Sequence, residues 1–256
     1  MRRSRPSPRK ILAVRLATLV GIALLWEAAA RSGLFYKDVV PSLHAVARAL
    51  LRQIGGAELY HNLTVTGLEV VAGFVIAFTF GVAFGILFGA RRFLGRIMEP
   101  YINALATTPK IVFLPVVMLM VGIGPESKTA LGALSGFFPI VLSTSAGMLR
   151  IRPVFILVGR SFNLRPQLMV TKIYLPSLVQ PIVTGMRLGL GVTIIGVLLA
   201  EVKFSNKGLG FLAIDFYNQF RIPDLYALLI IIFALAVAAN ALMTLAADRL
   251  KKGGNE

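Results

Sequence analysis

Long uninterrupted runs of apolar residues dominate the pattern of hydrophobic and polar positions along this chain. Residues 70–90, 129–149 and 225–247 are each more than twenty residues long and contain no Asp, Glu, Lys or Arg. A helix of about 20 apolar residues spans a hydrocarbon layer of about 30 Å. Continuous apolar runs differ from the alternating pattern of barrel strands, and only helices or closed barrels satisfy their backbone groups in lipid. The three runs therefore predict three membrane-spanning helices.

A fourth segment, residues 11–30, follows a basic N-terminus and carries Arg15 and Glu27 near its ends. Both side chains can reach the membrane interface from there. About twenty residues is closer to a spanning helix than to the shorter apolar region of a cleaved signal peptide. We therefore expect a retained membrane anchor.

Two further segments are interrupted by charge or proline. Residues 100–125 contain Lys110, Pro109 and Pro115, which predict a broken or kinked helix. The segment at residues 173–200 carries Arg187 near its centre, where a charge usually faces a bundle interior or a water-filled cavity. The chain is thus expected to be an all-α integral membrane protein with six transmembrane helices, at about residues 11–30, 68–90, 100–123, 128–149, 175–201 and 225–247.

Basic residues are distributed unevenly between the two sides that six alternating helices would define. Sixteen Lys and Arg residues fall on the side of the termini and eight on the other. The positive-inside rule then places both termini in the cytoplasm. The expected organisation begins with a cytoplasmic N-terminus at residues 1–10 and has an external segment at residues 31–66. A core of five spans follows at residues 67–249 and includes a cytoplasmic loop at residues 150–174. A cytoplasmic tail at residues 250–256 ends the chain.

Composition removes several classes of protein. The chain has 256 residues, 57% hydrophobic and 15% charged, which excludes a soluble enzyme or a disordered chain. It has no Cys and two His, so thiolate chemistry and a His-rich metal centre are excluded. The net charge of +16 could indicate nucleic-acid binding, but the basic residues flank the spans. The phosphate-binding pattern GxxxxGK[ST] is absent, so the sequence contains no P-loop for binding a nucleotide.

One amphipathic stretch lies in the external segment. Pro41 and Ser42 are typical of a helix start. This stretch predicts a short helix on the bilayer surface. Its apolar face would comprise Leu43, Val46, Ala47, Leu50 and Leu51, and its polar face His44, Arg48 and Arg52.

The longest stretch between spans on the cytoplasmic side, residues 150–176, reads RIRPVFILVGRSFNLRPQLMVTKIYLP. Pro153, Pro166 and Pro176 predict short helices separated by turns. Asn163 is a candidate for a left-handed turn residue. The loop either has a specific function or is a basic loop that only orients the chain.

This loop resembles the cytoplasmic signature loop of permease subunits in bacterial ATP-binding-cassette importers. Leu175-Pro176 matches the end of that signature, and Arg160 matches a basic residue near its start. Asn163 stands where the family has glycine, and residues 157–159 replace the family's Glu-Ala-Ala. Glu69 stands where relatives commonly have arginine. The runs TPKIVFLPVVMLMVGIGPESK, FFPI, GMRLGLG, AE and GLGFL are similar to the nitrate/sulfonate/taurine branch.

The resemblance implies the type I importer permease fold and a location in the bacterial inner membrane. Its loop would form a coupling helix that contacts a separate ATPase subunit, which binds ATP and Mg and is present in two copies. No cofactor is expected on this chain. A second permease copy, a periplasmic or lipid-anchored substrate-binding protein and membrane lipids would be partners, and nucleic acid would not. The residues expected at the ATPase contact are Arg160, Ser161, Phe162, Asn163, Leu164, Arg165, Gln167 and Leu168, with Leu175 and Pro176 at its end.

Polar residues within the spans are candidates for the translocation path. Each of them could instead be structural, because hydroxyl groups in membrane helices often bond to their own backbone and ionisable groups often pair. The ionisable candidates are Lys110, Arg187 and Glu201, and the hydroxyl candidates are Ser143, Thr144 and Thr184.

Glycines recur at short spacings, a pattern that lets membrane helices approach closely. We expect such packing at Gly81, Gly85 and Gly89, and at Gly185, Gly189 and Gly191.

The solute remains open at this point: nitrate, a sulfonate, taurine or a small carboxylate would all fit the resemblance. A self-sufficient secondary transporter and an integral-membrane enzyme are the alternatives. The enzyme is disfavoured because intramembrane enzymes use paired aspartates, Ser–His sets or His-rich metal sites. In this chain the Asp residues lie outside the spans, and neither His falls in a uniform apolar run.

Overall fold

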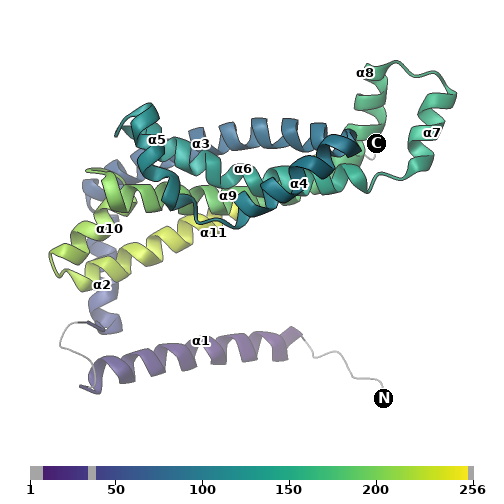
Figure 1. Cartoon of the computed structure of the whole chain (residues 1–256). Coiled ribbons are helices and arrows are strands. Elements are labelled where there is room, and N and C mark those ends of the chain that lie inside the picture. Colours follow the sequence, from purple (N-terminus) through teal and green to yellow (C-terminus); the bar gives the residue numbers. More distant parts are fainter. Residues whose placement is uncertain (1–7, 34–38, 253–256) are drawn as a thin grey trace. The chain divides into compact units, whose positions relative to one another are not determined.

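The computed structural model describes residues 8–33 and 39–252, and the elements that it describes are helical (Figure 1). The expected cytoplasmic segments at residues 1–10 and 250–256 lie largely outside the described residues. The chain divides into two compact units. The first comprises Met1–Leu59 with Ala213–Ile231, and the second comprises Tyr60–Leu212 with Ile232–Glu256.

Among the described residues, five helices are long and apolar enough to cross a membrane: Lys10–Arg31, Ala57–Ala90, Pro125–Leu149, Gln167–Phe204 and Ile222–Leu245. A sixth candidate consists of Arg92–Thr107 and Lys110–Val121, which meet at an angle of 94°. The all-α membrane fold is therefore confirmed, and the break expected near Pro109 is present. The helix predicted to start at residue 68 begins earlier, at Ala57.

The first unit contains α1 (Pro8–Arg31), α2 (Leu43–Ile54) and the start of α11 (Ile222–Lys252). The indole Nε1 of Trp26 donates a hydrogen bond to the Pro41 carbonyl at 3.0 Å, and its ring meets that of Tyr226 edge-on. Asp224 is 4% exposed and accepts hydrogen bonds from Arg52 at 2.5 Å and Arg221 at 3.0 Å. These contacts join α2 to the start of α11.

Helix α2 begins as expected, because the Ser42 hydroxyl accepts a hydrogen bond from the Ala45 amide. The expected face is partly wrong. Val46, Ala49 and Gln53 are buried, whereas Leu51 is 71% exposed. Contact with Ala227 and Tyr226 determines which face of α2 is buried. The spacing of apolar residues within one helix does not show where a neighbouring helix lies.

The second unit contains α3 (Ala57–Ala90), α4 (Arg92–Thr107), α5 (Leu114–Val121), α6 (Pro125–Leu149) and α9 (Leu175–Phe204). Helix α4 ends because Thr108, directly before Pro109, is extended with a ψ of 134°. A 3₁₀ turn, Lys110–Phe113, leads into α5, which accommodates Pro115 in its first turn.

Helices α3 and α6 pack closely through glycine (Figure 1). A Cβ on Gly81 would lie 2.8 Å from the Ile140 Cβ, and one on Gly85 would lie 2.6 Å from the Thr144 Cβ. Either distance is too short for two carbon atoms. Gly89 is closed off in the same way by Met148. The predicted glycine ridge on α3 is thus confirmed.

Helix α9 packs on α6 by the same means. A Cβ on Gly185 would lie 3.0 Å from the Ser143 Cβ, and one on Gly189 would lie 2.7 Å from the Ile140 Cγ1. Gly191 faces open space, so the expectation that it packs closely is wrong.

Candidate functional site

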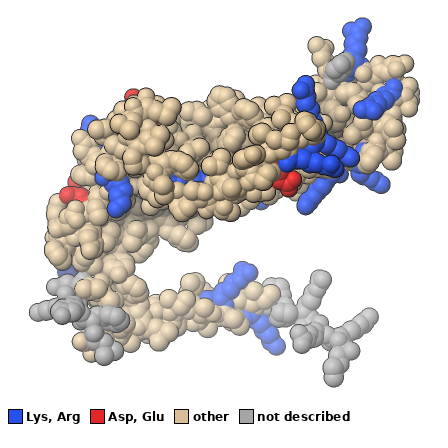
Figure 2. Space-filling model, in the orientation of Figure 1, with Lys and Arg blue, Asp and Glu red and all other residues tan. Residues whose placement is uncertain are grey.

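The loop at residues 150–176 folds into a helical hairpin. It consists of α7 (Pro153–Ser161), a turn at residues 162–165 and α8 (Pro166–Met169), followed by a π-helical turn, Val170–Tyr174, that runs into α9. Figure 1 shows α7 and α8 side by side, projecting beyond the end of α6 within the second unit. Most of the Lys and Arg side chains visible on this unit in Figure 2 lie at the same end. The hairpin is therefore both prominent and surrounded by positive charge.

A specific turn closes α7. Asn163 has a φ of 48°, as the sequence predicted, and its amide donates to the Arg160 carbonyl at 2.9 Å. The Leu164 amide donates to the Gly159 carbonyl at 3.0 Å. This pair of bonds around a left-handed residue is the Schellman motif, which satisfies the last carbonyls of a helix. The turn therefore has a defined shape.

Gly159 determines how the two arms of the hairpin pack. A Cβ at this position would collide with Met169 and would lie 2.6 Å from the Ile173 Cδ1. Between the arms lies a cavity of about 450 Å³, lined by side chains that include Phe155, Leu164 and Pro176. The hairpin thus has a small interior of its own.

The expected ATPase-contact residues fall into two groups. Phe162, at the tip of the hairpin, is 76% exposed. Leu175 and Pro176 are exposed too, but they lie in the first turn of α9 at the base of the hairpin. The structure therefore brings together at the tip an exposed group, Arg160, Ser161, Phe162, Asn163, Arg165, Gln167 and Leu168, with half-buried Leu164 beside it.

Two of the expected path residues line one cavity. Ser143 on α6 and Thr184 on α9 both face a cavity of about 370 Å³. The Ser143 hydroxyl also donates to the Pro181 carbonyl at 2.7 Å, which joins the two helices. Arg150 and Arg152, at the junction of α6 and α7, line the same cavity. It is therefore a polar space with basic residues at one end.

A polar stripe on α9 extends from this cavity toward the centre of the span. Ser177, Gln180 and Thr184 line the cavity at spacings of three and four residues, which places them on one face of the helix. Arg187 follows three residues later. Its side chain is half-buried, and its Nε has no hydrogen-bond partner among the described residues. The helical spacing puts this guanidinium in line with the cavity.

Lys110 and Thr144 do not line this cavity. The Lys110 ammonium donates to the carbonyls of Ala106 at 2.5 Å and Thr108 at 2.9 Å, where α4 ends. It also lies 5.1 Å from the centroid of the Phe138 ring. Thr144 is fully buried against Gly85. Lys110 therefore satisfies the carbonyls at the helix break, and Thr144 lies in the α3–α6 contact.

Glu201 is fully buried near the other end of α9. It accepts hydrogen bonds from the Thr66 hydroxyl at 2.6 Å and from the Gly210 amide at 2.7 Å. Its carboxyl group also interacts with that of Glu69, whose Oε2 has no hydrogen-bond partner among the described residues. The geometry of Glu201 is that of a residue that fixes the turn between α9 and α10 (Leu209–Asn218).

Comparison with known proteins identifies the family that has this architecture. Residues 77–253 match the model of the family described as binding-protein-dependent transport system inner membrane component. The chain belongs to this family. It is a permease subunit of an ATP-binding-cassette importer, in which the ATPase activity lies on a separate subunit.

The permease has relatives in the branch that its sequence resembles. It is 28% identical over 202 residues to the taurine transport system permease protein TauC of Escherichia coli, covering 77% of this chain and 74% of TauC. It is 28% identical over 175 residues to the nitrate import permease protein NrtB of Synechocystis, covering 68% of this chain and 62% of NrtB. The MetNI methionine transporter in an inward-facing conformation shares its fold, with a TM-score of 0.58 and 20% identity over 81% of this chain and 96% of that one.

Sequence reasoning missed three residues of the permease that these geometries need. Ser177 and Gln180 share the polar stripe with Thr184, and the signal was their spacing of three and four residues. The sequence indicates for Gly159 only that it belongs to the stretch at residues 157–159 that replaces the family's Glu-Ala-Ala. No pattern within the loop indicates that Met169 and Ile173 lie against it.

Proposed function

We propose that this permease imports a small anionic solute and that the α7–α8 hairpin transmits the movement of a separate ATPase. Family membership supports the general class. It disfavours the self-sufficient secondary transporter and the membrane enzyme as alternatives. The solute would be a sulfonate, taurine, nitrate or a related small anion.

The exposed tip of the hairpin is the observation that carries the coupling proposal. Phe162 stands 76% exposed on a turn with a defined shape. Arg160 and Arg165 flank it and are exposed as well. An aromatic anchor surrounded by polar contacts is typical of protein interfaces. Phe162 would enter a cleft of the ATPase, and the neighbouring polar residues would form the rim of the contact.

The polar stripe of α9 supports the path and the charge of the solute. Arg150 and Arg152 line the basic end of the cavity, and Arg187 lies further along α9. A cation within a span is costly to bury and commonly marks an ion or substrate pathway. A basic cavity also concentrates anions. The stripe would therefore guide an anion between the centre of the membrane and the hairpin side.

The remaining partners follow from the family. We propose that two permease copies, two ATPase subunits and an external substrate-binding protein form the transporter. Both termini and the hairpin would lie in the cytoplasm, as the excess of Lys and Arg on that side indicates.

Phe162→Ala tests the coupling role. The permease, its ATPase and its binding protein are reconstituted in vesicles, and ATP hydrolysis and solute uptake are measured together. We expect uptake to fall about tenfold or more, because truncating an interface anchor typically costs about 2 kcal/mol or more. Insertion and thermal stability should be unchanged, because the side chain is exposed.

Phe93→Ala is the matched control, since Phe93 is an 80% exposed aromatic residue on α4 that does not belong to the hairpin. Normal uptake by Phe162→Ala would contradict the coupling role. Uptake by the wild-type permease without any ATPase would contradict the proposed mechanism itself.

A further inference from the structure

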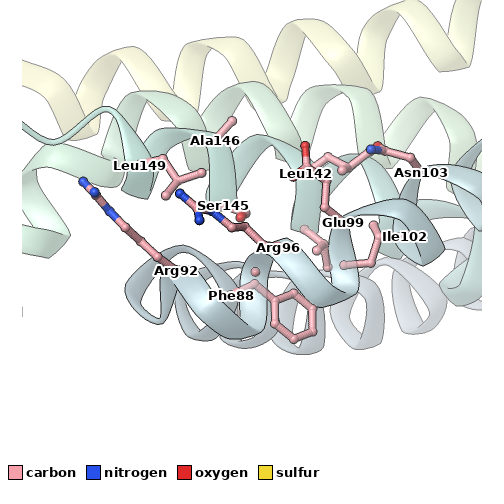
Figure 3. A pocket seen from close by; sticks show the side chains of 12 residues that line it. Phe88, Arg92, Arg96, Glu99, Ile102, Asn103, Leu142, Ser145, Ala146 and Leu149 are labelled. Atoms are coloured by element: carbon pink, nitrogen blue, oxygen red, sulfur yellow. The ribbon is translucent and has the colours of Figure 1, made fainter.

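A second polar cavity lies between α4 and α6. It has a volume of about 380 Å³, and its lining includes residues of α3, α4 and α6. Figure 3 shows the side chains of Arg92 and Arg96 extending from α4 toward α6, and in this view Arg96 ends beside Ser145 and Leu149. Ser143, which faces the α9 cavity, is two residues from Ser145 and therefore lies on a different face of α6. The two cavities share Ala146 in their described linings, but their polar lining residues differ.

Helix α4 turns its polar side toward this cavity. Arg92, Arg96, Glu99 and Asn103 line it at spacings of three and four residues, so they form one stripe of the helix. The opposite stripe is apolar and exposed: Phe93, Ile97, Tyr101 and Leu105. Arg92, Arg96 and Glu99 are exposed, so the polar stripe of this amphipathic helix forms an accessible wall of an open cavity.

The charges in the cavity have no partners within the described part of the chain. Neither Arg92 nor Arg96 forms an ion pair there, and Glu99 does not either. With two guanidinium groups and one carboxylate, the lining carries a net charge of about +1 at neutral pH. A single negative charge would neutralise it, whereas a dianion would leave an excess of negative charge beside Glu99.

We propose that this cavity binds a monoanionic oxyanion group. The forks of Arg92 and Arg96 match the geometry of oxygen atoms on phosphorus or sulfur. Asn103 and Ser145 add neutral donors, and Glu99 can accept a hydrogen bond from a hydroxyl group of the ligand. Two sources share this chemistry: the phosphodiester of an anionic phospholipid and a free sulfonate-type solute. The proposal concerns a site separate from the α9 path and does not rest on it.

The surroundings of the cavity favour the phospholipid as the source. Arg92 begins α4 two residues after the apolar helix α3 ends at Ala90, so it lies where a span meets the headgroup region. Phe88, Val141 and Leu142 contribute an apolar part of the lining that could contact the start of an acyl chain. Basic pockets between membrane helices bind anionic headgroups.

Binding to the full-length chain in detergent tests the site. The probes are short-chain phosphatidylglycerol and methanesulfonate as monoanions, sulfate as a dianion and short-chain phosphatidylcholine as a lipid without net charge. Isothermal titration calorimetry gives the dissociation constants. Arg96→Gln should weaken binding of a monoanion about tenfold, because a charge-assisted hydrogen bond is lost.

Arg91→Gln is the matched control. Arg91 is exposed, as Arg92 and Arg96 are, and it directly precedes Arg92, but it does not line the cavity. It should change the dissociation constant less than about twofold. Preferred binding of phosphatidylglycerol identifies the lipid as the source, and preferred binding of methanesulfonate identifies a free solute. Either result supports the site. Equal losses in Arg91→Gln and Arg96→Gln, or no monoanion binding by the wild type, would overturn it.

Glu99→Gln tests the charge of the cavity in the opposite direction to Arg96→Gln, because it should strengthen anion binding. Removal of the carboxylate raises the charge of the lining, so sulfate should bind more tightly than it does to the wild type. A gain in binding cannot arise from loss of folding. If sulfate bound equally to both chains, Glu99 would not face the ligand and the proposed site would be wrong. Equal binding of phosphatidylcholine and phosphatidylglycerol would overturn the lipid assignment.

Discussion

Asn163 adopts a φ of 48° at the end of α7, a conformation that costs most residues with a side chain about 1–2 kcal/mol. Asparagine tolerates it better than most residues, and the two hydrogen bonds of the turn hold it in place. The family's glycine at this position meets the same requirement. A single backbone angle thus explains why two different residue types can occupy the turn.

Substitutions of Asn163 should show whether uptake depends on the backbone conformation of the turn or on the asparagine side chain. Asn163→Gly is expected to keep the turn and to leave coupled uptake unchanged, because glycine reaches this angle without strain. Asn163→Val should destabilise the hairpin by roughly 1–2 kcal/mol and lower uptake. Hydrogen exchange of the Leu164 amide reports on the turn directly. Equal exchange in the two variants would show that the backbone angle is not what matters.

At the scale of elements, contacts between glycines and bulky side chains hold α3, α6 and α9 together. Apolar side chains gain little free energy when they move from lipid into a contact between helices. Close packing therefore has to provide much of the free energy of helix association. Gly81 and Gly85 on α3 and Gly189 on α9 all approach the same stretch of α6. The three helices therefore form a body that can move as one unit.

A pair of glycine substitutions on α3 tests this packing. In Gly85→Ala, the new Cβ would lie 2.6 Å from the Thr144 Cβ, and we expect a loss of roughly 1–3 kcal/mol from overpacking. Gly67→Ala is the control on the same helix, because nothing lies within 4 Å of its Cβ. It should be neutral or stabilise the helix by up to about 1 kcal/mol. Unfolding of the purified chain measures both changes, and similar values for the two would argue against the packing role.

On the scale of the whole molecule, most Lys and Arg residues lie outside the apolar membrane-spanning segments. Lys and Arg gather at the hairpin end of the second unit, as Figure 2 shows. Arg187 is an exception, because it lies near the centre of a span. A solute path is the reason we propose for the cost of placing a cation there.

Arg187→Gln tests the charge of the path. We expect anion uptake to fall about tenfold, because a charged contact to the solute is lost in transit. Arg187→Lys should retain part of the uptake, since the charge remains. Arg15→Gln removes a basic residue from the exposed surface of α1 and serves as the control for net charge. Normal uptake by Arg187→Gln would show that this guanidinium has a structural role.

Much of this architecture could be predicted because the membrane imposes simple constraints on sequence. The apolar runs give the spans, Pro109 gives the break after α4, and Asn163 gives the turn after α7. The face of α2 could not be predicted, because Ala227 and Tyr226 decide it and they are far away in sequence. The early start of α3 was also missed, since its first turns carry polar residues such as Glu58 and His61.

The sequence by itself therefore determined the class of this protein, the approximate positions of its apolar helices and the position of the loop that precedes α9. Each of these depends on local hydrophobicity, on prolines or on short motifs, which are properties of neighbouring residues. Only the tertiary structure decided that Gly159 lies against Met169, that Ser143 and Thr184 share a cavity, and that Glu201 fixes a turn. These facts depend on which helices meet and on which face, and the packing of distant segments sets both.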